Sequence, residues 1–543
     1  MTQTVATYPG PSADDQPVSG AEPNTAQAEH TELARLDRAL HWIRCACPTV
    51  PVLGIQWIQV QYPVYPEQEL LMAVERGDAV WPPAFEWIRT SSWQLARSIK
   101  HAVQTAWRIA LTKRMLRHEL RQLQQRSFDV VVKSWSVGAP PADDGSDFYF
   151  GDLQAQLRKR NQDVLILCGD TKGDDWRAFA RGQTSTDGLS RLPEICLLRP
   201  VDPIVMVMRQ IGSSLRLLGL ALRTPAGLSR RACLLAAQSV VGPRTTRNAT
   251  YCAIGRRVGL QWRPDALISL YEGRSWERCL WTGIRSSHAD CRIGGYQHTI
   301  LLPGLLSLLE PQRDLVSPAV PDVVLCQGRT TRELLAFGFA RLGVETIAFG
   351  SYRLLTDGGE PTPPAPDRKT VLVLPVGFLD ESCRLFEFAI SLASRMPDLR
   401  FILRCHPILA IEDILRLLNV SPDQLHNVDV SRDQSFGSDL SRASAVLYRG
   451  TAAALASTLS GLKPLYYGRG GTRSEDPLHS LASWRERVEN EEECIEVLER
   501  YGQTSPADAL LEWKSAADYV QDYAIPVDED SYAALCRALR LDV

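Results

Sequence analysis

The chain has 543 residues, and its 60 Lys and Arg against 63 Asp and Glu give a formal net charge of −3. Hydrophobic residues make up 45% and charged residues 23%, a composition typical of soluble globular proteins with about two to four domains. It excludes fibrous, wholly disordered and small disulfide-stapled classes, and the near-neutral charge argues against a protein that coats nucleic acid.

The ends and the cysteines predict a cytoplasmic protein. Residues 1–30 lack the basic start and apolar run of a secretion signal, so we expect a disordered tail. The 13 cysteines are scattered, and the pair Cys45 and Cys47 has no partner pair at zinc spacing, so we expect reduced thiols and no metal. Arg209 and Arg216 interrupt the most apolar stretch, residues 203–222, which predicts at most a peripheral contact with a membrane.

Residues 31–126 are expected to form an N-terminal extension. Residues 31–44 have helical spacing, and residues 83–126 form a long amphipathic pattern whose polar side is basic. Such a helix can lie on an anionic lipid surface, or it can be an ordinary solvated helix of its own domain. Residues 199–247 are rich in Arg and predict helices inserted into the domain that follows.

From Phe128 onward, short apolar runs alternate with helical segments, the pattern of βαβ units around a parallel sheet. The Pro- and Gly-rich stretch 356–368 is the expected linker, because it has no apolar period. The predicted fold class is therefore α/β, with two Rossmann-type doubly wound domains, 127–355 and 369–483, facing a cleft. Helices over 484–543 are expected to cap the second domain and to cross back to the first.

Three predicted strand ends of the second domain carry residues suited to phosphate. Ligands of open parallel sheets bind at the carboxyl ends of strands, where backbone amides, imidazoles and hydroxyls can surround an anion. The chain has neither a P-loop motif nor a G-x-G-x-x-G after a strand, which disfavours both of those folds. The residues expected to bind the donor's nucleotide and phosphate are Gly377; His406 and Pro407; and Arg449, Gly450 and Thr451.

The first domain offers candidates for a general base. Glu272 follows an apolar strand and precedes a glycine, which places a carboxylate at a strand end. His298 follows another predicted strand, so it is either the base instead or a structural histidine. Glu277 is expected to form an ion pair with Arg274 or Arg278 on a helix surface.

Three further residues are expected on the acceptor side of the same domain. Gln297 lies at the strand or loop edge that carries His298. Gly151 and Asp152 lie near the end of the first strand, although capping of the next helix explains Asp152 equally well.

The set YEG-x-x-W-E, GYQH, RCHP, YRGTAAALA and GLKPLYY resembles bacterial surface carbohydrate biosynthesis proteins of O-antigen-type loci, over about residues 128–468. That family implies a GT-B glycosyltransferase. His406-Pro407 and Gly450-Thr451 are also similar to the HP and Ser/Thr motifs of bacterial sialyltransferases and Kdo transferases, which implies contact with the phosphate of a CMP-sugar. By the same resemblance Glu272 carries the base, although Tyr271 stands where the motif has an acid.

The leading hypothesis is a metal-independent glycosyltransferase that needs no cofactor beyond its nucleotide-sugar co-substrate. Its acceptor would be a surface polysaccharide, such as lipopolysaccharide, or a lipid-linked glycan at the cytoplasmic face of the inner membrane. Two alternatives stay open. One is a CDP-polyol phosphotransferase on the same scaffold, and the other is a non-catalytic scaffold protein of a polysaccharide assembly complex.

Overall fold

The computed structural model describes residues 84–541, apart from 137–145, 171–174, 183–189, parts of 224–236 and of 304–319, 354–360, 421–425, 433 and 469–473. The expected tail, the helix predicted over 31–44 and the pair Cys45 and Cys47 lie outside the described residues.

The first domain is built on a seven-stranded parallel sheet. Apart from the half-exposed strand at Glu345–Ala348, its strands are almost entirely buried, because helices cover both faces, and this explains their continuous apolar runs. The order across the sheet is β3-β2-β1-β4-β5-β6-β7. The strands are β1 (Val130–Ser136), β2 (Val164–Asp170), β3 (Ser190–Pro193), β4 (Ala266–Leu270), β5 (Arg292–Tyr296), β6 (Val323–Cys326) and β7 (Glu345–Ala348).

Two helices of this domain pack unusually closely. A Cβ on Gly255 of α10 would lie 2.1 Å from the carbonyl oxygen of Leu280, and one on Gly283 of α11 would lie 2.3 Å from that of Cys252. Only glycine permits this approach, so the backbones of α10 and α11 are in direct contact. The helices around the sheet are α6 (Leu153–Lys159), α7 (Trp176–Gly182), the 3-10 helix η1 (Glu194–Leu197), α10 (Pro243–Gln261), α11 (Ser275–Arg285) and α13 (Arg329–Ala340).

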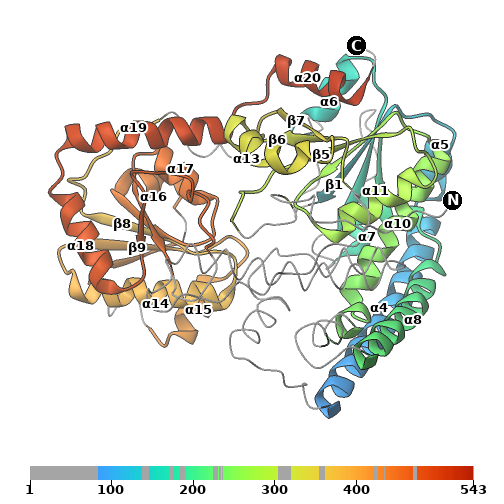
Figure 1. The fold of residues 1–543 in the computed structure, drawn as a ribbon, viewed down its shortest axis with the longest axis horizontal. Helices are drawn as coiled ribbons and strands as arrows, with labels where there is room; N and C mark the ends of the chain where they lie inside the picture. The colour runs from blue at the N-terminus through green and yellow to red at the C-terminus, as the bar shows by residue number, and fades with distance from the viewer. Residues whose placement is uncertain are drawn as a thin grey trace, which may run out of the picture.

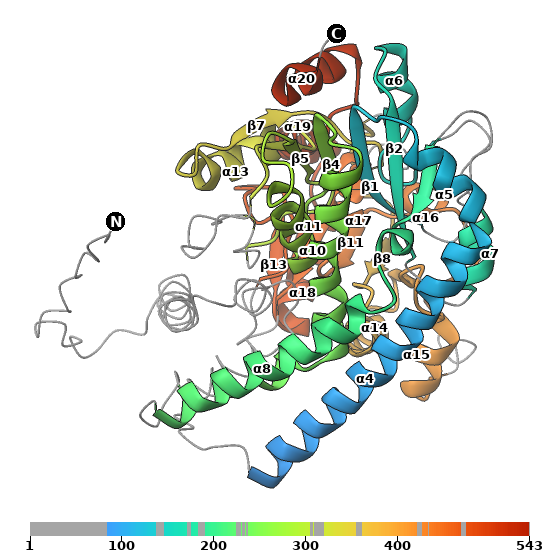
Figure 2. The ribbon, with the colours of Figure 1, turned by 90° about the vertical axis from the view of Figure 1, so that its right-hand side faces the viewer.

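A pair of long helices projects from the first domain (Figure 2). The pattern over 83–126 forms α4 (Ala84–Met115) and α5 (Arg117–Gln124), which are separated at Leu116. The predicted insertion supplies α8 (Asp202–Arg223), which packs along α4 and α10. Among the described residues, α8 is the one helix that is long and apolar enough to cross a membrane by length and composition.

The second domain repeats the architecture with six parallel strands, in the order β10-β9-β8-β11-β12-β13. The strands are β8 (Thr370–Leu374), β9 (Arg400–Arg404), β10 (Val428–Ser431), β11 (Ala445–Tyr448), β12 (Lys463–Tyr467) and β13 (Glu486–Val488). Their helices are α14 (Leu379–Arg395), α15 (Ile411–Leu417), α16 (Phe436–Arg442), α17 (Ala453–Leu459) and α18 (Glu491–Gly502). β13 lies where we predicted only helices. The sequence did not indicate it, because a strand of three residues, two of them charged, forms no apolar run.

The C-terminal helices connect the two domains (Figure 1). α19 (Pro506–Tyr523) packs on α17 of the second domain and on α13 of the first, and α20 (Glu529–Leu539) packs against β5, β6 and β7. In each sheet the first strand in the sequence is near the centre, and the second and third strands lie successively farther to one side of it. The later strands follow in sequence order on the other side, which is the Rossmann order. The predicted fold class, two Rossmann-type doubly wound domains in a GT-B-like α/β architecture, is confirmed.

Candidate functional site

The residues expected to bind phosphate meet at one edge of the second sheet. β9, β8 and β11 are neighbours, so the segments that follow them lie side by side. A Cβ on Gly377 would lie 3.1 Å from Nδ1 of His406, and one on Gly450 would lie 3.4 Å from Cβ of Val376. The missing side chain of Gly377 thus lets the imidazole of His406 pack against the segment after β8.

His406 is oriented by its own turn. The backbone N–H of Leu409 donates to the carbonyl oxygen of His406 at 2.9 Å, and the N–H of Ile408 approaches Nδ1 at 3.4 Å. Burial lowers the pKa of His406, which favours the neutral imidazole. With Nδ1 accepting, its proton is on Nε2, from which it can be donated to a phosphate oxygen. Pro407 is exposed at the start of the turn.

Arg449 supports the neighbouring turn from within the domain. Its side chain is 3% exposed, and its Nε lies 3.2 Å from a carboxylate oxygen of Glu381 and 3.5 Å from one of Glu475. Gly450 has a φ of +63°, and its N–H donates to the carbonyl oxygen of Glu475 at 3.1 Å. Two carboxylates therefore balance the charge of Arg449, which we expected from the sequence to act on the phosphate.

Thr451 follows this turn and begins the approach to α17. Its hydroxyl accepts the N–H of Ala453 at 3.3 Å, and the residue is half-buried. A threonine hydroxyl that accepts one hydrogen bond retains its own proton for donation. Thr451 and His406 are thus the donors that the structure brings to this edge.

The two alternative bases of the first domain form one pair. Glu272 follows β4 and His298 follows β5, the adjacent strand, and Nε2 of His298 lies 2.9 Å from Oε1 of Glu272. The side chain of Glu272 is 13% exposed and that of His298 is 7% exposed. The other carboxylate oxygen of Glu272 is paired with Arg274. The ring of Tyr149 packs on the imidazole at 4.9 Å between centroids. The carboxylate of Glu272 thus lies between the imidazole of His298 and the guanidinium of Arg274.

Glu277 is buried rather than on a helix surface, so the expected surface ion pair is wrong. One carboxylate oxygen accepts the N–H of Glu272 and the other accepts the N–H of Arg274, both at 2.9 Å. Burial, followed by repulsion from Glu272, raises the pKa of Glu277 well above its ordinary value. Glu277 therefore positions the segment that carries Glu272, a role that the sequence analysis missed.

The expected acceptor-side residues are engaged in packing. Gln297 is fully buried and contacts Gln327 at 3.4 Å, which ties together the ends of β5 and β6. Oδ1 of Asp152 accepts the hydroxyl of Tyr532 on α20 at 2.6 Å, and within the described residues its side chain makes no capping hydrogen bond to α6. Gly151 has a φ of +47° and lies directly under the ring of Tyr352. Contact of these residues with an acceptor stays a prediction.

No protein-family model matches the chain, and a comparison with curated proteins finds no match. Several solved structures are distantly similar to this chain. The glycotransferase of kitacinnamycin is 12% identical, with 76% of this chain and 100% of that chain covered and a TM-score of 0.43. The α,α-trehalose 6-phosphate synthase of Burkholderia multivorans is 11% identical, with 76% and 98% covered and a TM-score of 0.44.

The UDP-GlcNAc 2-epimerase of Neisseria meningitidis, bound to UDP-GlcNAc, is 12% identical, with 76% and 100% covered and a TM-score of 0.40. These identities and TM-scores are low. The strand orders of the two sheets show the fold independently of these likenesses.

Proposed function

We propose that the chain transfers a sugar from a nucleotide-activated donor to a hydroxyl of a glycan or a lipid-linked glycan. The observation that carries this proposal is that the candidate base and the candidate phosphate-binding residues lie at strand ends of different sheets. The Glu272–His298 pair lies at strand ends of one Rossmann-type sheet, and the His406 and Gly450 turns lie at strand ends of the other. Strand ends of this kind are where ligands of open parallel sheets bind.

In the proposed reaction the acceptor oxygen attacks the anomeric carbon of the donor sugar and the bond to the nucleotide phosphate breaks. The Glu272–His298 pair takes the proton of the attacking hydroxyl. Nε2–H of His406 and the hydroxyl of Thr451 donate to the leaving phosphate as its charge develops. Arg449, held by Glu381 and Glu475, keeps the Gly450 turn in place. A CMP-linked acidic sugar is the donor that the motif resemblance favours.

The first test is thermal stabilisation by CMP, CDP, UDP, GDP and dTDP. A ligand at a hundredfold excess over its Kd stabilises the folded state by about 2.7 kcal/mol, which is readily measured as a higher melting temperature. We expect one nucleotide to stand out, and His406→Asn to weaken its binding by roughly tenfold through loss of a charge-assisted hydrogen bond.

The matched control is His426→Asn, an exposed histidine of the same domain, which should bind the nucleotide as the unaltered chain does. If no nucleotide raises the melting temperature, the proposal fails and the non-catalytic scaffold is favoured. Transfer of label from the β-phosphate of a CDP-polyol into product would instead identify the phosphotransferase.

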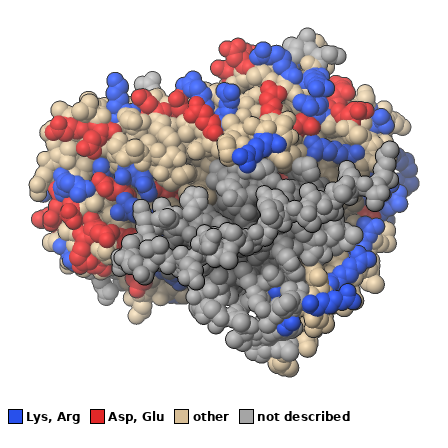
Figure 3. All heavy atoms as spheres, in the orientation of Figure 1, with Lys and Arg blue, Asp and Glu red and all other residues tan. Residues whose placement is uncertain are grey.

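We also infer that the α4–α8 pair contacts an anionic membrane surface. Each helix leaves a set of large apolar side chains exposed beside exposed cations, and Lys and Arg gather along the edge that the pair forms (Figure 3). This combination fits a helix lying in the lipid interface. The apolar set is Phe85, Ile88, Trp93, Ile99, Val103 and Trp107 on α4, with Ile204, Val205, Met208, Leu215 and Leu222 on α8. The cations are Arg89, Arg97, Lys100 and Arg114, with Arg209, Arg216 and Arg223.

Flotation with liposomes tests this contact. The chain should float with vesicles of phosphatidylglycerol and phosphatidylcholine, and less with phosphatidylcholine alone. Val103→Asp with Met208→Asp should abolish flotation, because a charge then faces the acyl region. Leu511→Asp, at a residue that is 78% exposed on α19, is the matched control and should float normally. Equal flotation of all variants, or no preference for anionic lipid, would contradict the inference.

A further inference from the structure

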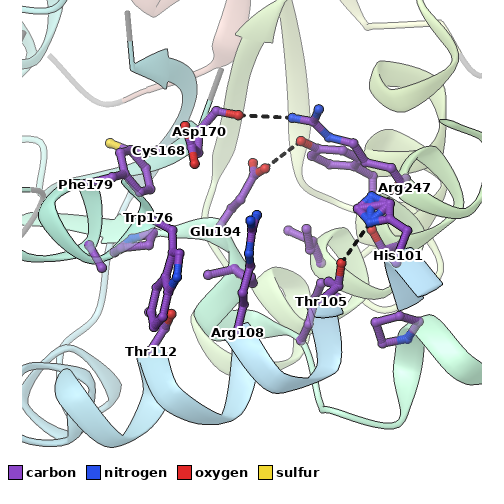
Figure 4. A pocket seen from close by; sticks show the side chains of 18 of the residues that line it. His101, Thr105, Arg108, Thr112, Cys168, Asp170, Trp176, Phe179, Glu194 and Arg247 are labelled. Carbon is purple, nitrogen blue, oxygen red and sulfur yellow. Dashed lines mark hydrogen bonds between the residues drawn. The ribbon is translucent and has the colours of Figure 1, made fainter. Parts of the chain in front are cut away.

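A cavity of about 220 Å³ lies between α4, α7 and α10, at the carboxyl ends of β2 and β3 (Figure 4). None of our sequence predictions points to it. β2 is two places from β4 in the sheet, and neighbouring strands are about 4.8 Å apart. The cavity therefore lies roughly 10 Å across the sheet from β4, the strand that Glu272 follows. It is thus separate from the Glu272–His298 pair but on the same edge of the same sheet.

Two arginines contribute to the polar part of the cavity. Arg108 reaches in from α4 (Figure 4), and among the described residues it forms no ion pair and no hydrogen bond. Arg247 enters from α10, where it donates to the carbonyl oxygen of Asp170 at 3.2 Å and packs over the ring of Trp135. Burial, with Arg247 and Arg108 adding to it, lowers the pKa of the neighbouring His101. The two guanidinium groups therefore create a positive potential inside the cavity.

Two acids also line the cavity, and the charge of one of them is balanced by a lysine outside the lining. Glu194 accepts the hydroxyl of Tyr251 at 2.5 Å and lies 3.1 Å from Nζ of the fully buried Lys133. The other is Asp170 at the end of β2. Arg108, Arg247 and Lys133 thus outnumber the two acids, which leaves a net attraction for an anion.

Apolar side chains form much of the rest of the wall, among them Trp176 and Phe179 on α7 with Ile195, Leu198 and Ile254. Hydroxyl groups of Thr105, Thr112, Thr246 and Thr250 also line the cavity. The ring of Trp176 meets Trp107 edge-on, with centroids 5.9 Å apart, and Trp107 belongs to the exposed apolar set of α4. Apolar surface therefore continues from the cavity to the outside of α4. The cavity is smaller than the roughly 300 Å³ of sites that enclose a whole drug-sized ligand, so it suits a head group whose chain continues outside.

We propose that this cavity binds a phosphate carrying an apolar chain, with the phosphate at Arg108 and Arg247 and the first carbons against Trp176 and Phe179. The chain leaves over Trp107 toward the exposed face of α4. The inference rests on the proposed function in one respect, because it identifies the amphiphile as the lipid carrier of the acceptor glycan. The carrier's phosphate would then be held on the same sheet edge as the proposed base.

The test is titration of the purified full chain with decyl phosphate below its micelle concentration, in the absence of any nucleotide. Decyl phosphate should bind, and inorganic phosphate and decanol should each bind at least tenfold more weakly, because each supplies only half of the contacts. Arg108→Gln should weaken decyl phosphate binding by roughly tenfold, and Trp176→Ser should weaken it as well. Arg181→Gln, an exposed cation of α7 outside the cavity, should leave binding unchanged.

Three outcomes would overturn the proposal. Inorganic phosphate binding as tightly as decyl phosphate would mean that the apolar wall is not used. Decanol binding as tightly as decyl phosphate would mean that the cations are not used. Equal binding of decyl phosphate by Arg108→Gln and by the unaltered chain would mean that the amphiphile binds elsewhere. Because nucleotide binding is measured separately, a failure here leaves the proposed donor site untouched, and a failed nucleotide panel does not remove amphiphile binding.

Discussion

Replacing Glu272 with Gln is expected to lower the rate of sugar transfer by about 10²- to 10⁴-fold, the range that a positioned general base contributes. The substitution keeps the shape of the side chain but removes the carboxylate that lies 2.9 Å from His298. The fold should survive, since Glu277 accepts the backbone N–H groups of Glu272 and Arg274 in this segment. The measurement is kcat for the donor identified by the nucleotide panel, at saturating acceptor.

His298→Asn should lower kcat to a similar extent, and the double variant should lose little more than either single variant. Residues that act as one unit give such non-additive effects. Glu345→Gln, at an exposed position at the start of β7, is the matched control and should retain full activity. Multiplied losses in the double variant would show two independent roles, and unchanged kcat in Glu272→Gln would remove the pair from the mechanism.

The residues at strand ends were predictable from the sequence because their signal is local. An apolar run that stops at a glycine or at His-Pro predicts both the strand and the position of the next residue at its carboxyl end. Glu272, His298, Gly377, His406 and Gly450 were all located in this way. The pairing of Glu272 with His298 then follows from the adjacency of β4 and β5.

Glu277 was misjudged because its local pattern is ambiguous. A glutamate three residues after one arginine and one before another is typical of a solvated helix surface. In the structure α11 is buried, since Gly255 and Gly283 let α10 approach it closely enough to enclose that side. This approach depends on two glycines about 28 residues apart, and no periodicity within either helix reveals it.

The cavity could not be predicted for a related reason. Its walls come from α4, β2, α7, η1 and α10, which are brought together only when the projecting helices pack on the sheet. Each contributor has an ordinary local explanation. Arg108 belongs to a basic helix face, and Glu194 follows a short strand. Only the fold shows that the two face one space.

Replacing Lys133 with Met is expected to reduce the free energy of unfolding by about 3–5 kcal/mol, the cost of leaving one member of a buried ion pair without its partner. Lys133 is on the central strand β1 and is fully buried. Its Nζ lies 3.1 Å from Glu194, donates to the carbonyl oxygen of Ser134 at 2.7 Å and lies 3.7 Å from the centroid of the Trp135 ring. Burial lowers the pKa of Lys133, and the Glu194 carboxylate opposes that shift.

Urea unfolding measures the effect, with Lys369→Met, at an exposed residue, as the control that should leave the midpoint unchanged. Adding Glu194→Gln to Lys133→Met should restore part of the lost stability, because the uncompensated carboxylate is then gone. The same argument connects this pair to the cavity. With Lys133 replaced, the charge of Glu194 is no longer balanced, so decyl phosphate should bind more weakly and should recover when Glu194→Gln is added. A Lys133→Met variant as stable as the unaltered chain would show that the pair contributes nothing to the fold.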